Sequence, residues 1–261
     1  PRPDEPGSDR WAHAGDVVHA AVLRHGDGRD RPWLVCLHGF GMGYTGPDLA
    51  AFRADELHRR HLLNVVVPVL PRHGPRRIRN GSALLSLDVV QSVHGLSQAV
   101  WDMRRLIGWI RATTGQPVGI TGISLGGYTT ALVAGLEPVD LAIAGIPAAD
   151  FPDLLSRHAP PHVRRTAKRH GILGEHADAV ARVVSPLAFA PRVPQPRRFI
   201  YAGMGDRLAP ASHALRLWEH WEQPAIRCYP GGHVGFVWSR PVRQFVTESL
   251  AASGFATPNR G

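Results

Sequence analysis

The 261-residue sequence has few of the features that mark disulfide-bonded or membrane proteins. It contains only two cysteines, Cys36 and Cys228, each inside an apolar run, so we expect two buried free thiols and neither a disulfide framework nor a cysteine metal site. No apolar run approaches the roughly 18 residues that a membrane helix needs. Residues 1–15 are polar and contain no apolar core of a signal peptide, and we therefore expect a cytoplasmic protein without a membrane span.

Lys168 is the only lysine in the sequence, yet its many arginines give the chain a formal net charge of +9. A basic balance can indicate a nucleic acid, an anionic lipid or an acidic substrate as partner. No run of five or more like charges occurs, which favours an arginine-rich solvated surface. We expect no nucleic-acid partner, with a nucleic-acid-binding protein as the alternative.

Apolar strands alternate with amphipathic helices along most of the chain. This order predicts a single α/β domain over residues 1–261, with a mainly parallel sheet covered by helices on both faces. A Pro-, His- and Arg-rich block at about 150–196 interrupts the pattern, and we interpret it as an insertion in lid position over the sheet. Strands are predicted at 17–23, 33–37, 64–70, 118–123, 139–146, 197–202 and 225–229, and helices at 96–113, 125–136, 211–222 and 240–252.

The residues Gly122-Ile123-Ser124-Leu125-Gly126 form a G-x-S-x-G pattern between a predicted strand and a predicted helix. In this setting the serine lies on a tight turn and can act as a nucleophile, and the glycines are needed because the turn has no room for side chains. A serine hydroxyl is a poor nucleophile until a base removes its proton, so Ser124 requires a histidine.

Two loop residues complete the predicted catalytic triad. His233 follows a strand on a glycine-flanked loop, and we predict that it is the base; otherwise it is an ordinary loop histidine. Asp206 follows the preceding strand in the same way, and we predict that it orients His233. Asp206 could instead cap the next helix, and Asp150 is the alternative acid.

Two backbone N–H groups are predicted to form an oxyanion hole, those of Leu125 and of Phe40 in the run His38-Gly39-Phe40. His38 is interpreted as a structural loop residue and not as a second base. Residues 41–46 also match the dinucleotide pattern G-x-G-x-x-G, but Pro71 and Arg72 stand where the ribose-binding acid should be. We therefore predict no cofactor and no metal, with NADP binding as the alternative.

Taken together, His38-Gly39-Phe40, the G-x-S-x-G pattern, Asp206 and His233 resemble the α/β-hydrolase fold, in which the triad follows the chain order Ser, Asp, His. The resemblance extends over residues 17–252 and is nearest to uncharacterised bacterial α/β-hydrolase-domain proteins. It implies an eight-stranded, mostly parallel sheet with Ser124 on a nucleophile elbow.

The sequence therefore predicts a serine hydrolase, carboxylesterase-like, that cleaves a small-molecule ester or related acyl substrate through an acyl-enzyme. The alternatives are a non-catalytic binding protein of the same fold, or an acyltransferase or peptidase with the same triad. Basic residues near the expected pocket suggest a substrate with a negative group, although solvated loops explain them equally well. These residues are Arg72, His73, Arg76, Arg77, Arg79, Arg157, Arg164, Arg165, Lys168 and Arg169.

Overall fold

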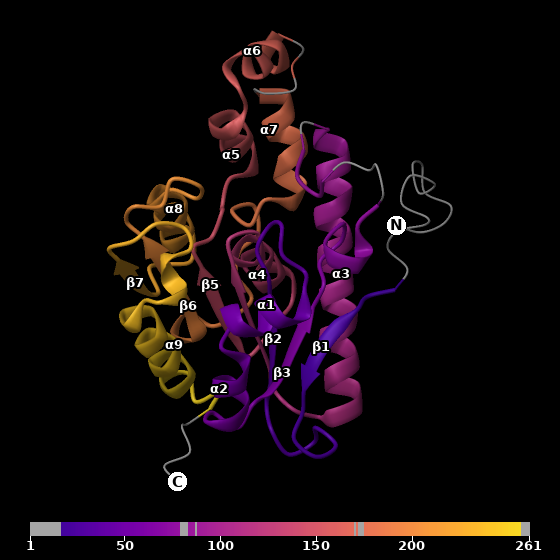
Figure 1. Cartoon of the computed structure of the whole chain (residues 1–261), viewed down its shortest axis with the longest axis vertical. Coiled ribbons are helices and arrows are strands. Elements are labelled where there is room, and N and C mark those ends of the chain that lie inside the picture. Colours follow the sequence, from indigo (N-terminus) through magenta and orange to yellow (C-terminus); the bar gives the residue numbers. More distant parts are fainter. Residues whose placement is uncertain (1–16, 79–82, 87, 170, 172–174, 257–261) are drawn as a thin grey trace.

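A mixed seven-stranded sheet lies at the centre of the computed structural model, which describes residues 17–78, 83–86, 88–169, 171 and 175–256 (Figure 1). The strand order is β1-β3-β2-β4-β5-β6-β7; β1 runs antiparallel to β3 and every other pair is parallel. The predicted mainly parallel sheet is confirmed, with seven strands in the described residues instead of eight. The strands are β1 Ala20–Leu23, β2 Trp33–Leu37, β3 Asn64–Pro68, β4 Val118–Ile123, β5 Leu141–Gly145, β6 Arg198–Gly203 and β7 Ala225–Tyr229.

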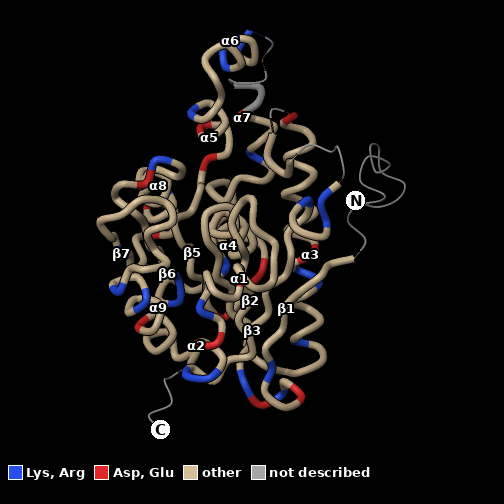
Figure 2. Tube along the Cα trace, in the orientation of Figure 1, with Lys and Arg blue, Asp and Glu red and all other residues tan. Residues whose placement is uncertain are grey.

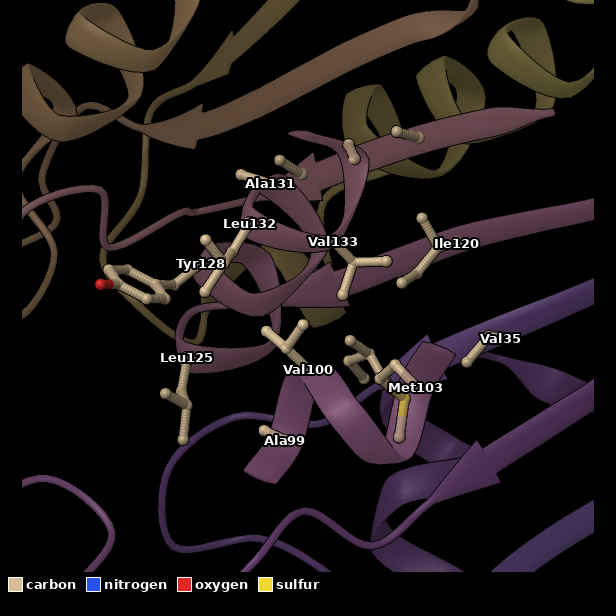
Figure 3. Packing of buried hydrophobic residues seen from close by; sticks show 14 of the residues in the cluster. Val35, Ala99, Val100, Met103, Ile120, Leu125, Tyr128, Ala131, Leu132 and Val133 are labelled. Carbon is tan, nitrogen blue, oxygen red and sulfur yellow. The ribbon is translucent and has the colours of Figure 1, made fainter. Parts of the chain in front are cut away.

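Helices cover both faces of the sheet, which is why its inner strands are buried throughout and mostly apolar. In β2, Val35 and Leu37 pack into the core on one face and Leu34 and Cys36 into the core on the other, since successive side chains alternate. Figure 3 shows the first core, where Val100 and Met103 lie between their helix and the sheet. That face is covered by α3 Val89–Thr114, α4 Leu125–Leu136 and α8 Ala211–His220, and the opposite face by α1 Thr45–Ala51, α2 Ala54–Arg59 and α9 Arg240–Ala252.

The long helix α3 has clear start and stop signals. The Asp88 carboxylate accepts a hydrogen bond from the Gln91 N–H at 2.9 Å, and Gly115 ends the helix in a left-handed conformation with φ 69°. The helix begins seven residues before the predicted start at residue 96. Its first turns carry Gln91 and Ser92, which interrupt the apolar spacing used for the prediction.

The predicted insertion joins β5 to β6 and is helical. Figure 1 shows α5, α6 and α7 together at one end of the molecule, beyond the sheet. Short turns of 3₁₀ helix connect several elements. The bounds are α5 Phe151–His158, α6 Pro161–Arg169 and α7 Glu175–Ala181, and η2 Gly74–Arg76, η3 Arg182–Val184, η4 Gln195–Arg197 and η5 Gly235–Val237.

One expectation about the cysteines is wrong. Cys36 is buried in the central strand β2, but Cys228 is exposed. Cys228 lies on β7, the edge strand of the sheet, most of which is exposed, so an apolar sequence run there does not ensure burial. No helix in the described residues is long and apolar enough to cross a membrane.

Candidate active site

Ser124 lies between β4 and α4 in a backbone conformation that few residues other than glycine adopt, with φ 55° and ψ −114°. The flanking glycines are required by close packing. A Cβ atom on Gly126 would collide with the carbonyl group of Leu37, and one on Gly122 would collide with the carbonyl of Gly126. The turn therefore presents the Ser124 hydroxyl at the carboxyl end of the sheet, at the first turn of α4.

The loops after β6 and β7 bring the predicted acid, Asp206, and the predicted base, His233, together. The Met204 N–H donates to the Tyr229 carbonyl and the Gly205 N–H to the Gly231 carbonyl, both at 3.0 Å. At Gly203 the loops are so close that a Cβ atom would lie 2.6 Å from the Gly231 oxygen. Because β6 and β7 are parallel neighbours, their loops leave the sheet at the same edge.

A continuous hydrogen-bond chain joins the three predicted triad residues. The Ser124 hydroxyl lies 2.9 Å from His233 Nε2, and His233 Nδ1 lies 2.7 Å from Asp206 Oδ2. The second oxygen of Asp206 accepts the N–H groups of Leu208 and Ala209 at 2.8 and 2.9 Å. Since the buried carboxylate can only accept, the proton of neutral His233 belongs on Nδ1, and the lone pair of Nε2 faces Ser124.

Neither alternative role for the acid matches the structure. Asp150 caps α5 through the Asp153 N–H and pairs with Arg216, so it is not joined to His233. Helix α8 is preceded by Pro210 and has no side-chain cap, so Asp206 does not serve as its N-cap.

The loop of residues 38–43, which we call the oxyanion loop after its predicted role, lies against Ser124. A Cβ atom on Gly39 would be in ordinary contact with the Ser124 Cβ, at 3.7 Å. Within the described part of the chain, neither the Phe40 N–H nor the Leu125 N–H donates to a protein acceptor. Leu125 is also the first residue of α4, where the helix dipole favours negative charge. Both N–H groups are therefore available to an oxygen bound beside Ser124.

His38 is predicted to be a structural loop residue, and the structure adds hydrogen bonds of its ring that the sequence did not indicate. The Leu70 N–H donates to His38 Nε2 at 3.0 Å, so Nδ1 carries the proton and donates it to the Gly39 carbonyl at 2.8 Å. That carbonyl and the Phe40 N–H belong to one planar trans peptide and point in opposite directions. Burial lowers the pKa of His38 to about 4, which keeps this ring neutral.

Two further groups stabilise these loops. His73 packs edge-on against the rings of His38 and Phe40, and burial lowers the pKa of His73 to about 4. Tyr229 donates its hydroxyl to the Gly232 carbonyl at 3.0 Å in the loop of His233. Burial, with the nearby negative charge of Asp206, raises the pKa of Tyr229 to about 12, so the phenol stays protonated.

Comparison with solved structures supports the same architecture. Acetyl xylan esterase 1 from Thermoanaerobacterium superposes with a TM-score of 0.67 at 17% identity, covering 90% of this chain and 78% of that one. A Pyrococcus furiosus esterase gives 0.62 at 16% identity, covering 91% and 89%. A puromycin-hydrolysing peptidase from Mycobacterium tuberculosis gives 0.63 at 19% identity, covering 94% and 39%. The chain has the α/β-hydrolase fold.

Sequence comparison adds relatives without a described activity. Two uncharacterised proteins from two strains of Mycobacterium tuberculosis are 49% identical to this chain over 97% of its length. The chain spans 62% of the length of these curated relatives. No family model matches the sequence.

Ser124 and His233 open onto a cavity of about 720 Å³ at the carboxyl edge of this α/β-hydrolase sheet. The cavity is lined mainly by apolar side chains from the oxyanion loop, from α5 and α6, and from the loops of Asp206 and His233. Among the described residues, none of those lining the cavity is Arg or Lys. The hypothesis of an anionic substrate therefore gains no support from the residues in contact with the cavity.

The basic residues that suggested an anionic substrate do not line this cavity where the structure describes them. Arg76 is buried and pairs with Asp102 at 2.9 Å, and Arg157 pairs with Asp153 at 2.5 Å. Arg79 lies outside the described residues. Figure 2 shows basic residues spread over both ends of the chain trace and interspersed with acidic ones.

The residues that match the dinucleotide pattern have another role. They form the oxyanion loop and the start of α1, where the buried carboxylate of Asp48 accepts the Gly43 N–H at 3.1 Å. A phosphate at this loop would meet a carboxylate in place of a free N–H group, which disfavours the NADP alternative. No cluster of three or more metal-ligating side chains occurs among the described residues.

Proposed function

We propose that this protein is a serine hydrolase that cleaves an ester or a related acyl substrate. The supporting observation is the hydrogen-bond chain from Ser124 through His233 to Asp206, next to two available N–H groups. The likeness to esterases and to a peptidase agrees with hydrolysis of an acyl bond.

The geometry accounts for each proton in the reaction. Ser124 attacks the substrate carbonyl carbon while His233 Nε2 takes the hydroxyl proton, and Asp206 stabilises the resulting imidazolium. The Phe40 and Leu125 N–H groups hold the negative oxygen of the tetrahedral intermediate. His233 then gives its proton to the departing alcohol, which leaves an acyl group on Ser124. His233 next deprotonates a water molecule, and this water releases the acid and restores the enzyme.

Helices α5 to α7 form the lid of this enzyme in our proposal. Phe151, Leu154, Leu155 and His158 of α5 line the same cavity as Ser124, so a substrate bound there lies against this helix. The lid and the sheet together form one catalytic domain.

The direct test is the substitution Ser124→Ala, assayed with p-nitrophenyl acetate. We expect kcat to fall by at least about 10⁴-fold, because removal of a triad nucleophile leaves only binding and the oxyanion hole. Ser212→Ala, an exposed serine on α8, is the matched control and should retain full activity. Full hydrolysis by Ser124→Ala would show that the assignment is wrong. Transfer of the acyl group to an added alcohol or amine in preference to water would indicate an acyltransferase.

A further inference from the structure

The cavity beside Ser124 is lined almost entirely by apolar residues. Apart from Ser86, Ser124, His158 and His233, the described residues lining it are aliphatic, aromatic, methionine, glycine or proline. Both histidine rings and the catalytic hydroxyl are already hydrogen-bonded to protein atoms. A polar substrate group that does not reach the Phe40 or Leu125 N–H or the Ser86 hydroxyl would therefore lose its water in the cavity without gaining a partner, at an appreciable free-energy cost.

Helix α5 supplies much of the apolar lining and is fixed in place over it. Phe151, Leu154 and Leu155 of α5 contact the cavity. At the end of the helix, the His158 ring lies 2.8 Å from the carbonyl oxygen of Leu208, in the loop that holds the catalytic acid. The helix thus has contacts on the far side of the cavity, and its leucines face the space next to the nucleophile.

Side chains at the mouth of the cavity continue the apolar surface. Phe40, Leu208 and Val234 line the cavity, yet each is more than half exposed. Large apolar side chains kept in water next to a catalytic serine are typical of a surface that an apolar ligand covers on binding.

We infer that the acyl group cleaved by this enzyme is uncharged and apolar, with a size of about eight carbons or more. This inference rests on the proposed function and specifies the substrate of the same site. A volume of about 720 Å³ lies in the range that holds a drug-sized ligand, whereas an acetyl group would leave most of it unfilled. Filling the cavity removes apolar surface from water on both the acyl group and the protein.

The first experiment measures kcat/KM for p-nitrophenyl acetate, butanoate and octanoate. Full burial of one methylene corresponds to a factor of about four, so we expect octanoate to exceed butanoate by at least about tenfold. A preference for acetate over octanoate would overturn the inference while leaving the proposed function intact, provided that the hydrolysis depends on Ser124. No hydrolysis of any ester, together with no fluorophosphonate labelling, would instead contradict the proposed function.

The second comparison tests charge at constant length. The p-nitrophenyl esters of hexanoic acid and of adipic acid, as its monoester, each have six acyl carbons but differ by a terminal carboxylate. We expect kcat/KM for the charged ester to be at least about 100-fold lower, because no described residue lining the cavity is Arg or Lys. Equal values, or a preference for the adipate ester, would overturn the inference and restore the anionic alternative.

The third experiment connects the preference to α5. Leu155→Asn should lower the octanoate-to-acetate ratio of kcat/KM at least about tenfold, since it places an amide in the apolar lining. Leu215→Asn is the matched control, because Leu215 is 46% exposed on α8 and does not contact the cavity, and its ratio should be unchanged. If Leu155→Asn does not fold, Val163→Trp, which fills the cavity, should lower the same ratio. A wild-type ratio in folded Leu155→Asn would overturn the role of α5, and a wild-type ratio in folded Val163→Trp, a change on α6, would overturn the placement of the acyl group in this cavity.

Discussion

Asp206→Asn is the substitution whose effect the geometry defines most closely. The amide oxygen of Asn can still accept the N–H groups of Leu208 and Ala209, so the loop should keep its fold. The amide nitrogen, however, replaces the oxygen that lies 2.7 Å from His233 Nδ1, and it is a donor. His233 must then place its proton on Nε2, where it faces the Ser124 hydroxyl and cannot accept a proton from it.

We expect kcat to fall by about 10⁴-fold, the loss measured for the same change in a serine protease triad, which corresponds to about 5 kcal/mol. KM should change little, because the cavity lining is untouched. The assay is p-nitrophenyl acetate hydrolysis, with a thermal melt to confirm folding. Asp150→Asn is the control: Asn also caps helices well, and kcat should stay within about twofold of wild type. Retention of more than a tenth of kcat by Asp206→Asn, or an equal loss in Asp150→Asn, would refute the assignment of the acid.

Three further outcomes are expected. Gly126→Ala should lower the free energy of unfolding by about 3 kcal/mol or prevent folding, because the added Cβ collides with backbone atoms. Gly108→Ala on α3 is the control: its Cβ enters open space, so this change should raise the free energy of unfolding by about 0.5–1 kcal/mol. Urea denaturation measures both. His38→Phe should lower kcat about 10–100-fold with little change in KM, since the oxyanion loop loses the hydrogen bond from His38 Nδ1 to the Gly39 carbonyl, which orients the Phe40 N–H; a wild-type kcat would contradict this role. The folded pKa of His73 is about 4, below its unfolded value of about 6.5, so from pH 6.5 down to 4 the unfolded chain binds a proton that the folded protein does not. His73 should therefore lower the free energy of unfolding by up to about 1.4 kcal/mol for each unit that the pH falls in this range. In urea titrations, the free energy of unfolding of His73→Phe should depend less steeply on pH than that of the wild type.

The sequence predicted the strand, turn and helix around Ser124 to the residue, because the constraints on this turn are local. Strand 118–123 and helix 125–136 have the expected bounds. Gly122 and Gly126 are required by contacts within a few residues of Ser124 and with the adjacent strand. The partners Asp206 and His233 were also predictable, because each follows a parallel strand and such strands end at one edge of the sheet.

Properties set by distant contacts were not predictable. Arg76 follows a strand and was expected near the pocket, but Asp102 on α3 binds it inside the protein. The contact of His38 with its neighbouring carbonyl depends on a tautomer fixed by Leu70, 32 residues away. Exposure of Cys228 depends on the place of β7 in the sheet and not on its apolar sequence.

The central claim, that His233 activates Ser124 as a nucleophile, is tested most directly by mapping covalent labelling with a fluorophosphonate probe. We predict one phosphonyl group per chain, in the tryptic peptide 112–157, with fragment ions that assign it to Ser124 and not to Ser156. His233→Ala should slow this labelling by at least about 100-fold. Labelling at another serine, or an unchanged rate in His233→Ala, would contradict the account.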